Sequence, residues 1–146
     1  MSKAEAAVHI FNQGFNCSQA LLSTYGEQLG LNKETALKIA CPFGAGMGRM
    51  SETCGAVTGA YMLIGLKHGK YLAEDDESKE KSYALVNEFN EKFNSLHGSI
   101  LCKDLLKYDM KKPEDMAAIK EQGLWQKLCP IFIRDAAQVI EELLDL

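Results

Sequence analysis

Hydrophobic residues recur at spacings of three and four along nearly the whole of this 146-residue chain. That is the period of an α-helix with one buried face, whereas the period-two alternation of a half-buried strand is nearly absent. The pattern therefore predicts an all-α protein. Because the length suits one domain with its own hydrophobic core, we expect a single compact bundle of about five to seven helices over residues 1–146.

Cap residues and helix breakers indicate where the helices begin and end. The first predicted helix is Lys3–Asn12, and Asn16 with Gln19 forms a capping-box pattern at the start of the second. Further helices are predicted over 33–41, from Ser51 to about His68, over 77–96, after Ser99, after Pro113 and from Pro130 onward. Residues 43–50 are expected to form a flexible loop.

Five cysteines are scattered singly through the sequence, without a CxxC pair. Their odd number, and a start without the basic and apolar regions of a secretory signal, disfavour an extracellular disulfide framework. We therefore expect a reducing, cytoplasmic compartment. In such a compartment several cysteines indicate a metal site, catalysis or simple packing.

Charge and hydropathy disfavour two other classes of protein. The net charge of −4 is mild, unlike the basic surface of a nucleic-acid-binding protein or a polybasic membrane patch. The longest apolar stretch, 53–66, is shorter than the roughly 20 residues of a membrane span, and we interpret it as a buried core helix. We expect neither a nucleic-acid partner nor membrane insertion.

Four of the cysteines fall at predicted helix N-termini. They are Cys17 after Asn16, Cys54 after Ser51, Cys102 after Ser99, and Cys129 before Pro130. Unpaired N–H groups and the helix dipole stabilise a thiolate there, so we expect a lowered thiol pKa. If the four helix starts converge, they form a site suited to zinc or to an iron–sulfur centre. The alternative is that each cysteine is a small apolar core residue.

The stretch from Phe43 to Gly59, FGAGMGRMSETCGAVTG, resembles the redox-active family named for its C-GCAxxG-C-C pattern. The other matching segments are Asn16-Cys17-Ser18-Gln19-Ala20, His97-Gly98-Ser99-x-x-Cys102 and Cys129, so the likeness extends from about Ala6 to Leu144. One departure is visible: Cys54 precedes Gly55 in the central motif, which here reads Thr-Cys-Gly-Ala.

The resemblance implies a helical domain whose cysteines Cys17, Cys54, Cys102 and Cys129 hold a redox centre. It implies an iron–sulfur cofactor, 2Fe–2S or 4Fe–4S, by analogy with a similar domain in split-Soret-type cytochromes. The chain has no CxxCH sequence for haem attachment, and Cys41 falls outside the pattern. We therefore expect an electron-transfer or accessory redox protein rather than a stand-alone enzyme, with an oxidoreductase or an electron carrier as its partner.

Two other functions are compatible with the same cysteines. One is metal-free thiol–disulfide exchange, against which the absence of CxxC counts. The other is a structural zinc domain used for protein interaction.

Glycines near the central motif suggest close backbone contacts. The loop Gly44-x-Gly46-x-Gly48-Arg49 lacks the third glycine of a GxGxxG phosphate loop, so we interpret it as backbone that passes close to the cysteine site. Arg49 either balances thiolate charge or pairs with Glu52. The Gly55-x-x-x-Gly59 spacing predicts a tight helix contact, either within the chain or at a homodimer seam.

Overall fold

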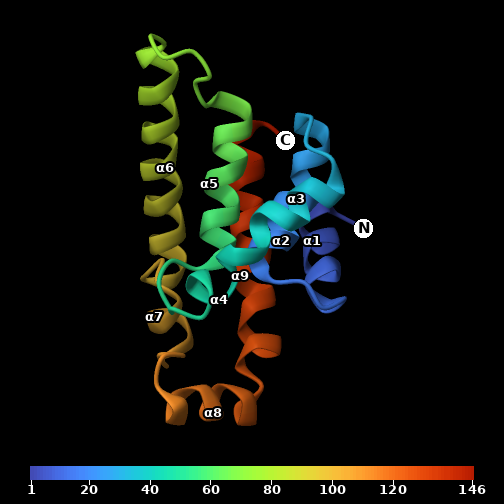
Figure 1. Cartoon of the computed structure of the whole chain (residues 1–146), viewed down its shortest axis with the longest axis vertical. Coiled ribbons are helices and arrows are strands. Elements are labelled where there is room, and N and C mark those ends of the chain that lie inside the picture. Colours follow the sequence, from blue (N-terminus) through green and yellow to red (C-terminus); the bar gives the residue numbers. More distant parts are fainter.

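The computed structural model describes residues 1–146 and is all-α, as the sequence predicts (Figure 1). The helices are α1 (Lys3–Asn12), α2 (Cys17–Gly26), α3 (Lys33–Ala40), α4 (Gly44–Met47), α5 (Gly55–His68), α6 (Asp76–His97), α7 (Cys102–Leu106), α8 (Pro113–Gln122) and α9 (Leu124–Leu144). Two 3₁₀ turns, η1 (Glu27–Leu29) and η2 (Cys41–Phe43), flank α3. Seven of the helices have eight or more residues, which agrees with the expected number.

Helices α2, α5 and α9 form the centre of the bundle. Helices α1 and α3 pack on one side of this centre, and α6 pairs with α5 on the other (Figure 1). Helix α8 crosses the lower end of the molecule, and α9 then runs back along its length. The core is one cluster of 31 buried hydrophobic residues, four of which are cysteines.

Local capping explains the starts of the first two helices. Helix α1 has the predicted bounds. At α2 the Gln19 N–H donates to Asn16 Oδ1 and the Asn16 N–H donates to Gln19 Oε1, both at 2.9 Å. This reciprocal pair is a capping box, which satisfies N–H groups that otherwise have no intrahelical partner.

The predicted cap residues of α5 and α7 are wrong. Ser51 is fully buried with φ 59°, and its Oγ accepts a hydrogen bond from the Met110 N–H, so α5 begins only at Gly55. Ser99 accepts from the Leu101 N–H and donates to Asp104, and α7 begins at Cys102. In both places a serine bonds elsewhere instead of capping the helix that follows.

The predicted start of α9 at Pro130 is also wrong. Gly123 adopts a left-handed conformation that ends α8, and α9 begins directly after it, which leaves Pro130 inside the helix. Proline lacks the N–H that would bond to the Gln126 carbonyl. The extension is favoured because Trp125 and Leu128 pack against the hydrophobic core.

The Gly55-x-x-x-Gly59 contact forms within the chain. A Cβ at Gly59 would lie 2.9 Å from the Leu21 Cβ and 3.2 Å from the Ser18 carbonyl oxygen, both on α2. The tight contact predicted from the glycine spacing is therefore the seam between α2 and α5. A homodimer stays a prediction.

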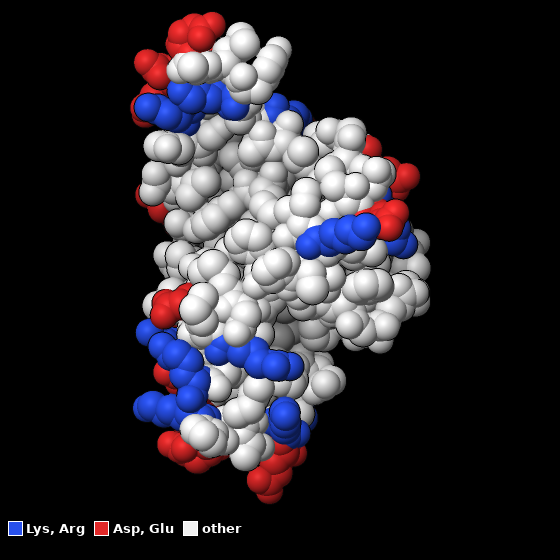
Figure 2. Space-filling model, viewed as in Figure 1, with Lys and Arg blue, Asp and Glu red and all other residues white.

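Charged side chains are unevenly distributed over the surface. On the face shown in Figure 2, basic and acidic groups intermingle at the two ends of the molecule, and most of the middle carries no charge. No helix combines the length and the apolar character needed to cross a bilayer.

Candidate functional site

Four cysteines line the same cavity, whose volume is about 640 Å³. They are Cys17 (7% exposed), Cys54 (4%), Cys102 (8%) and Cys129 (8%), each from a different segment of the chain. The remaining cysteine, Cys41, is exposed and lies outside this cavity. The structure therefore gathers the four cysteines that the sequence selected and leaves the fifth apart.

The starts of α2 and α5 meet at Gly55. Cys17 is the first residue of α2, and Cys54 immediately precedes α5 as its N-cap. A Cβ at Gly55 would lie 3.0 Å from the Ser18 backbone nitrogen and 3.1 Å from the Cys17 Cβ. Glycine at this position thus allows the two cysteine-bearing helix starts to approach each other.

A short stretch of paired backbone places Cys102 beside Cys54. The Cys54 N–H donates to the Ile100 carbonyl at 2.8 Å, and the Cys102 N–H donates to the Glu52 carbonyl at 2.6 Å. These bonds surround an isolated antiparallel bridge between the segments. Cys102 then begins α7, so a third thiol comes from a helix start.

Cys129 reaches the cavity differently. It lies within α9 and not at the start of a helix, because α9 begins before Pro130. Its thiol nevertheless lies beside that of Cys17, since α9 packs against both α2 and α5. Three of the four cysteines are therefore at helix starts as predicted, and Cys129 is not.

The expectation that these positions lower the thiol pKa is wrong for three of the cysteines. The neighbouring Cys129 thiol, and after it burial, raises the pKa of Cys17 well above its usual value. Burial raises the pKa of Cys54 to about 12, although backbone N–H groups at the start of α5 favour its ionised form. Burial and the neighbouring thiols also raise the pKa of Cys102. Desolvation outweighs the N–H groups, so these thiols are protonated at neutral pH in the metal-free protein.

The segment before α5, which contains the short helix α4 where the sequence predicts a flexible loop, forms a wall of the cavity. Its residues 45–49 all have φ between 57° and 68°, a left-handed turn in which each non-glycine residue costs about 1–2 kcal/mol. The Gly48 N–H donates to the Gly44 carbonyl and the Glu52 N–H to the Gly46 carbonyl, both at 3.0 Å. A Cβ at Gly46 would lie 2.5 Å from the Glu52 nitrogen. The prediction that these glycines allow close backbone passage beside the cysteines is confirmed at Gly46 but not at Gly48, where a Cβ would meet nothing within 4 Å.

The lining of the cavity includes two aromatic residues that sequence reasoning did not select. Phe11 and Phe15 line it with Trp125, and closeness in sequence to Cys17 is the one signal that could have indicated the two phenylalanines. Arg49 is the only charged residue that lines the cavity. Of the two alternatives for Arg49, the ion pair with Glu52 does not form, and Glu52 instead lies 4.0 Å from Lys111 Nζ.

The donor set of the cavity consists of thiols alone, with no histidine or carboxylate. No group of three or more His, Cys, Asp or Glu side chains lies close enough to hold one metal ion. Four cysteine thiolates are the ligand set of the common iron–sulfur clusters, in which bridging sulfides separate the irons. The donor chemistry fits such a cluster, whereas the spacing does not form a site for a single ion.

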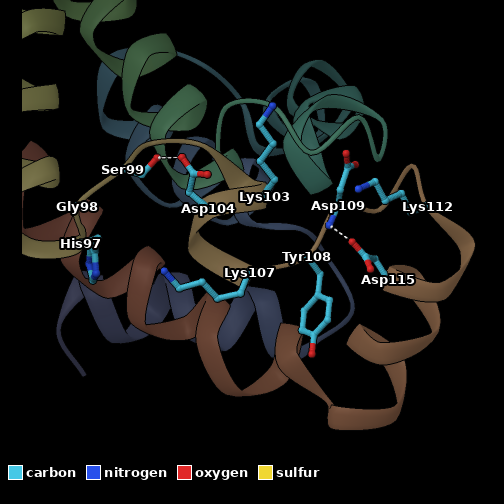
Figure 3. Close-up of a pocket in the computed structure, with 10 residues that line it drawn as sticks. All are labelled: His97, Gly98, Ser99, Lys103, Asp104, Lys107, Tyr108, Asp109, Lys112 and Asp115. Carbon is cyan, nitrogen blue, oxygen red and sulfur yellow. Dashed lines mark hydrogen bonds between the residues drawn. The ribbon is translucent and has the colours of Figure 1, made fainter.

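A second cavity, of about 600 Å³, lies beside α7 and contains no cysteine (Figure 3). Asp104 accepts a hydrogen bond from the Ser99 hydroxyl at 2.7 Å, and Asp115 accepts one from the Asp109 N–H at 2.9 Å. The Lys103 and Lys107 side chains point in different directions (Figure 3). Because its acidic groups are engaged locally and its cations do not converge, this cavity is a weaker candidate than the thiol cavity.

The chain belongs to the family described as "Putative redox-active protein (C_GCAxxG_C_C)", whose sequence profile matches residues 15–143. The match spans all four cysteines of the cavity, so the resemblance seen in the sequence is confirmed. Searches among curated proteins and among solved structures gave no match.

Proposed function

We propose that this member of the C_GCAxxG_C_C family is a small electron-transfer protein in which Cys17, Cys54, Cys102 and Cys129 hold an iron–sulfur centre. The observation that carries the proposal is the convergence of four buried thiols on one cavity. When bound, such a centre supplies reversible one-electron chemistry.

The chain's own groups suit this role in two ways. The raised pKa of Cys54 and its neighbours means that loading the site releases their protons, so metal affinity rises with pH. The buried side chains of Leu105, Leu106 and Phe132 line the same cavity. They exclude water from the sulfurs, and a low local polarity is one of the factors that set a reduction potential.

A cluster suits the site better than a structural zinc ion. Zinc needs four ligands at about 2.0–2.3 Å around one point, and no three candidate ligands are grouped closely enough for this. A cluster spans more space, because its own sulfides bridge the irons.

We further propose that the partner is an oxidoreductase or an electron carrier that approaches the open side of the cavity. Exposed residues there include Asn12, Gly48 and Gln126. The five free thiols are compatible with a reducing compartment such as the cytoplasm.

The proximity of the Cys17 and Cys129 thiols favours one other candidate, reversible dithiol oxidation. In that reaction the two thiols would lose two electrons and two protons, and a disulfide of the partner would be reduced to two thiols. The raised pKa of Cys17 counts against it, because the attacking species is a thiolate. Peptide mapping of metal-free protein equilibrated with oxidised glutathione tests this alternative. A reversible Cys17–Cys129 disulfide supports dithiol chemistry.

Anaerobic purification tests the proposed centre. The wild-type chain is expected to be brown, with iron and acid-labile sulfide in equal amounts and an electron paramagnetic resonance signal on reduction. Replacing any of the four cavity cysteines by serine should abolish or destabilise the centre, whereas Cys41→Ser should retain it. A colourless, iron-free wild-type protein after anaerobic reconstitution would rule the proposal out.

A further inference from the structure

The thiol cavity extends from a buried floor to a rim exposed to solvent. The cysteines at its floor are at most 8% exposed. Asn12, Arg49 and Gln126 line the same cavity and are exposed. The volume of the whole cavity, floor included, is about 640 Å³ and lies within the range of roughly 300–1,000 Å³ that is typical of small-molecule sites. The outer part of the cavity is therefore available to a ligand that enters from solvent.

Three partly exposed aromatic side chains line this cavity. Phe11 belongs to α1, Phe15 to the turn between α1 and α2, and Trp125 to the first turn of α9. All three are partly buried, so each keeps some surface accessible. Apolar walls with a few polar groups at the edge are the usual composition of a small-molecule site. Here the polar groups include the amides of Asn12 and Gln126.

Arg49 provides the single charge at the rim. It has no acidic partner within 4 Å, and Glu52, the carboxylate nearest in sequence, pairs with Lys111. The residue has φ 68° and belongs to the left-handed turn that packs against the cavity. A free guanidinium presents planar donors that bind a carboxylate or a phosphate through two parallel hydrogen bonds.

We propose that the outer part of the cavity binds a small organic anion. Its apolar or aromatic body contacts Phe11, Phe15 and Trp125, and its carboxylate or phosphate group binds Arg49. This site goes beyond the proposed electron-transfer function, and its occupation does not require a bound metal centre.

Trp125 supplies the measurement, because it is the only tryptophan in the chain. The full metal-free chain is titrated with benzoate and with phenyl phosphate while tryptophan fluorescence is followed. Benzyl alcohol serves as the uncharged analogue, and inorganic phosphate as the anion without an apolar body. We expect saturable changes in tryptophan fluorescence with one or both aromatic anions. Benzyl alcohol should bind at least about tenfold more weakly, because a hydrogen bond to a charged group contributes about a factor of ten in affinity. The preferred aromatic anion distinguishes a carboxylate ligand from a phosphate ligand.

Variants of Arg49 test whether its guanidinium binds the anionic group of the ligand. Arg49→Gln should weaken binding of the aromatic anion about tenfold or more and leave benzyl alcohol unchanged, and Arg49→Lys should fall between the two. Lys103→Gln, which removes a cation from the second cavity, is the matched control and should bind like wild type. Circular dichroism verifies that each variant is folded. If Arg49→Gln does not fold, Arg49→Lys is compared with wild type instead.

Two results would overturn the anion site. One is the absence of any saturable response to both aromatic anions up to about 10 mM. The other is equal anion binding by wild type and the folded Arg49 variants. Iron and sulfide content, measured separately, decides the electron-transfer proposal, so either proposal can fail without the other.

Discussion

The thiol of Cys17 lies beside the thiol of Cys129 in the same cavity, although Cys17 begins α2 and Cys129 lies well inside α9. Their contact requires α9 to pack against α2, just as the approach of Cys17 to Cys54 requires glycine at position 55. The thiol cavity is therefore a product of tertiary packing. Substitutions at these packing contacts should affect the site even where no cysteine is changed.

Gly46 and Gly48 form a matched pair in the left-handed turn. Both have positive φ, but a Cβ would contact backbone at Gly46 and meets nothing within 4 Å at Gly48. Gly48→Ala should therefore cost about 1 kcal/mol from conformation alone, whereas Gly46→Ala should cost about 3 kcal/mol or more, because backbone must move. Urea denaturation of the metal-free protein measures both. Equal losses would contradict the packing described at Gly46.

Ser51 joins the loop to the segment after α7. Ser51→Ala should lower the free energy of unfolding by about 1–3 kcal/mol, because it leaves the buried Met110 N–H without its acceptor at 2.8 Å. Ser95→Ala removes a hydroxyl that bonds locally on the exposed face of α6, and should change stability by less than about 0.5 kcal/mol. A Ser51 variant as stable as the Ser95 variant would show that the long-range hydrogen bond contributes nothing.

Gly59 and Gly65 test the seam between α2 and α5. Gly65 lies in α5 with open space around it, so Gly65→Ala should stabilise the protein by about 0.5–1 kcal/mol through helix propensity. Gly59→Ala should instead destabilise it by about 1–3 kcal/mol, because the new methyl group meets α2. Denaturation midpoints of the two variants should move in opposite directions. A shift of both in the same direction is incompatible with a tight seam at Gly59.

The stability of the metal-free protein should depend on pH through Cys54. Its folded pKa of about 12 exceeds the value of about 8.5 in an unfolded chain. The contribution of this thiol to the free energy of unfolding is therefore fully present below about pH 8.5. It is lost as the pH rises toward 12, because the thiol ionises first in the unfolded chain. The stability of wild type relative to Cys54→Ser should thus fall by about 1.4 kcal/mol per pH unit above about pH 9. Urea denaturation of both proteins from neutral pH to about pH 10 measures this difference. A constant difference would contradict the burial of Cys54.

Local signals predicted much of the fold. The Asn16–Gln19 capping box and the ends of α1 depend on residues a few positions apart, so their sequence pattern defines them. Ser51 and Pro130 were misleading because their surroundings are set at long range. A serine before a helix has the same sequence signature whether its hydroxyl caps that helix or accepts from the Met110 N–H. A proline likewise fits a first turn or, where flanking residues such as Trp125 pack into the core, a helix interior.

The sequence predicted which cysteines come together in one cavity, but not their pKa values. The family pattern selected the four cysteines that line the cavity and excluded Cys41. The sequence could not show that burial outweighs the helix N-termini at Cys54, because desolvation depends on all the elements packed around the sulfur. The single domain, the bound cofactor, the partner, a homodimer and the cytoplasmic location stay predictions.

Anomalous diffraction at the iron absorption edge, from crystals grown anaerobically, tests the central claim most directly. The measurement locates iron relative to the sulfur atoms of Cys17, Cys54, Cys102 and Cys129. We predict anomalous density between these four sulfurs on the floor of the thiol cavity. Crystals of reconstituted protein that lack iron at this position, or that hold it at Cys41 or elsewhere on the surface, would contradict it.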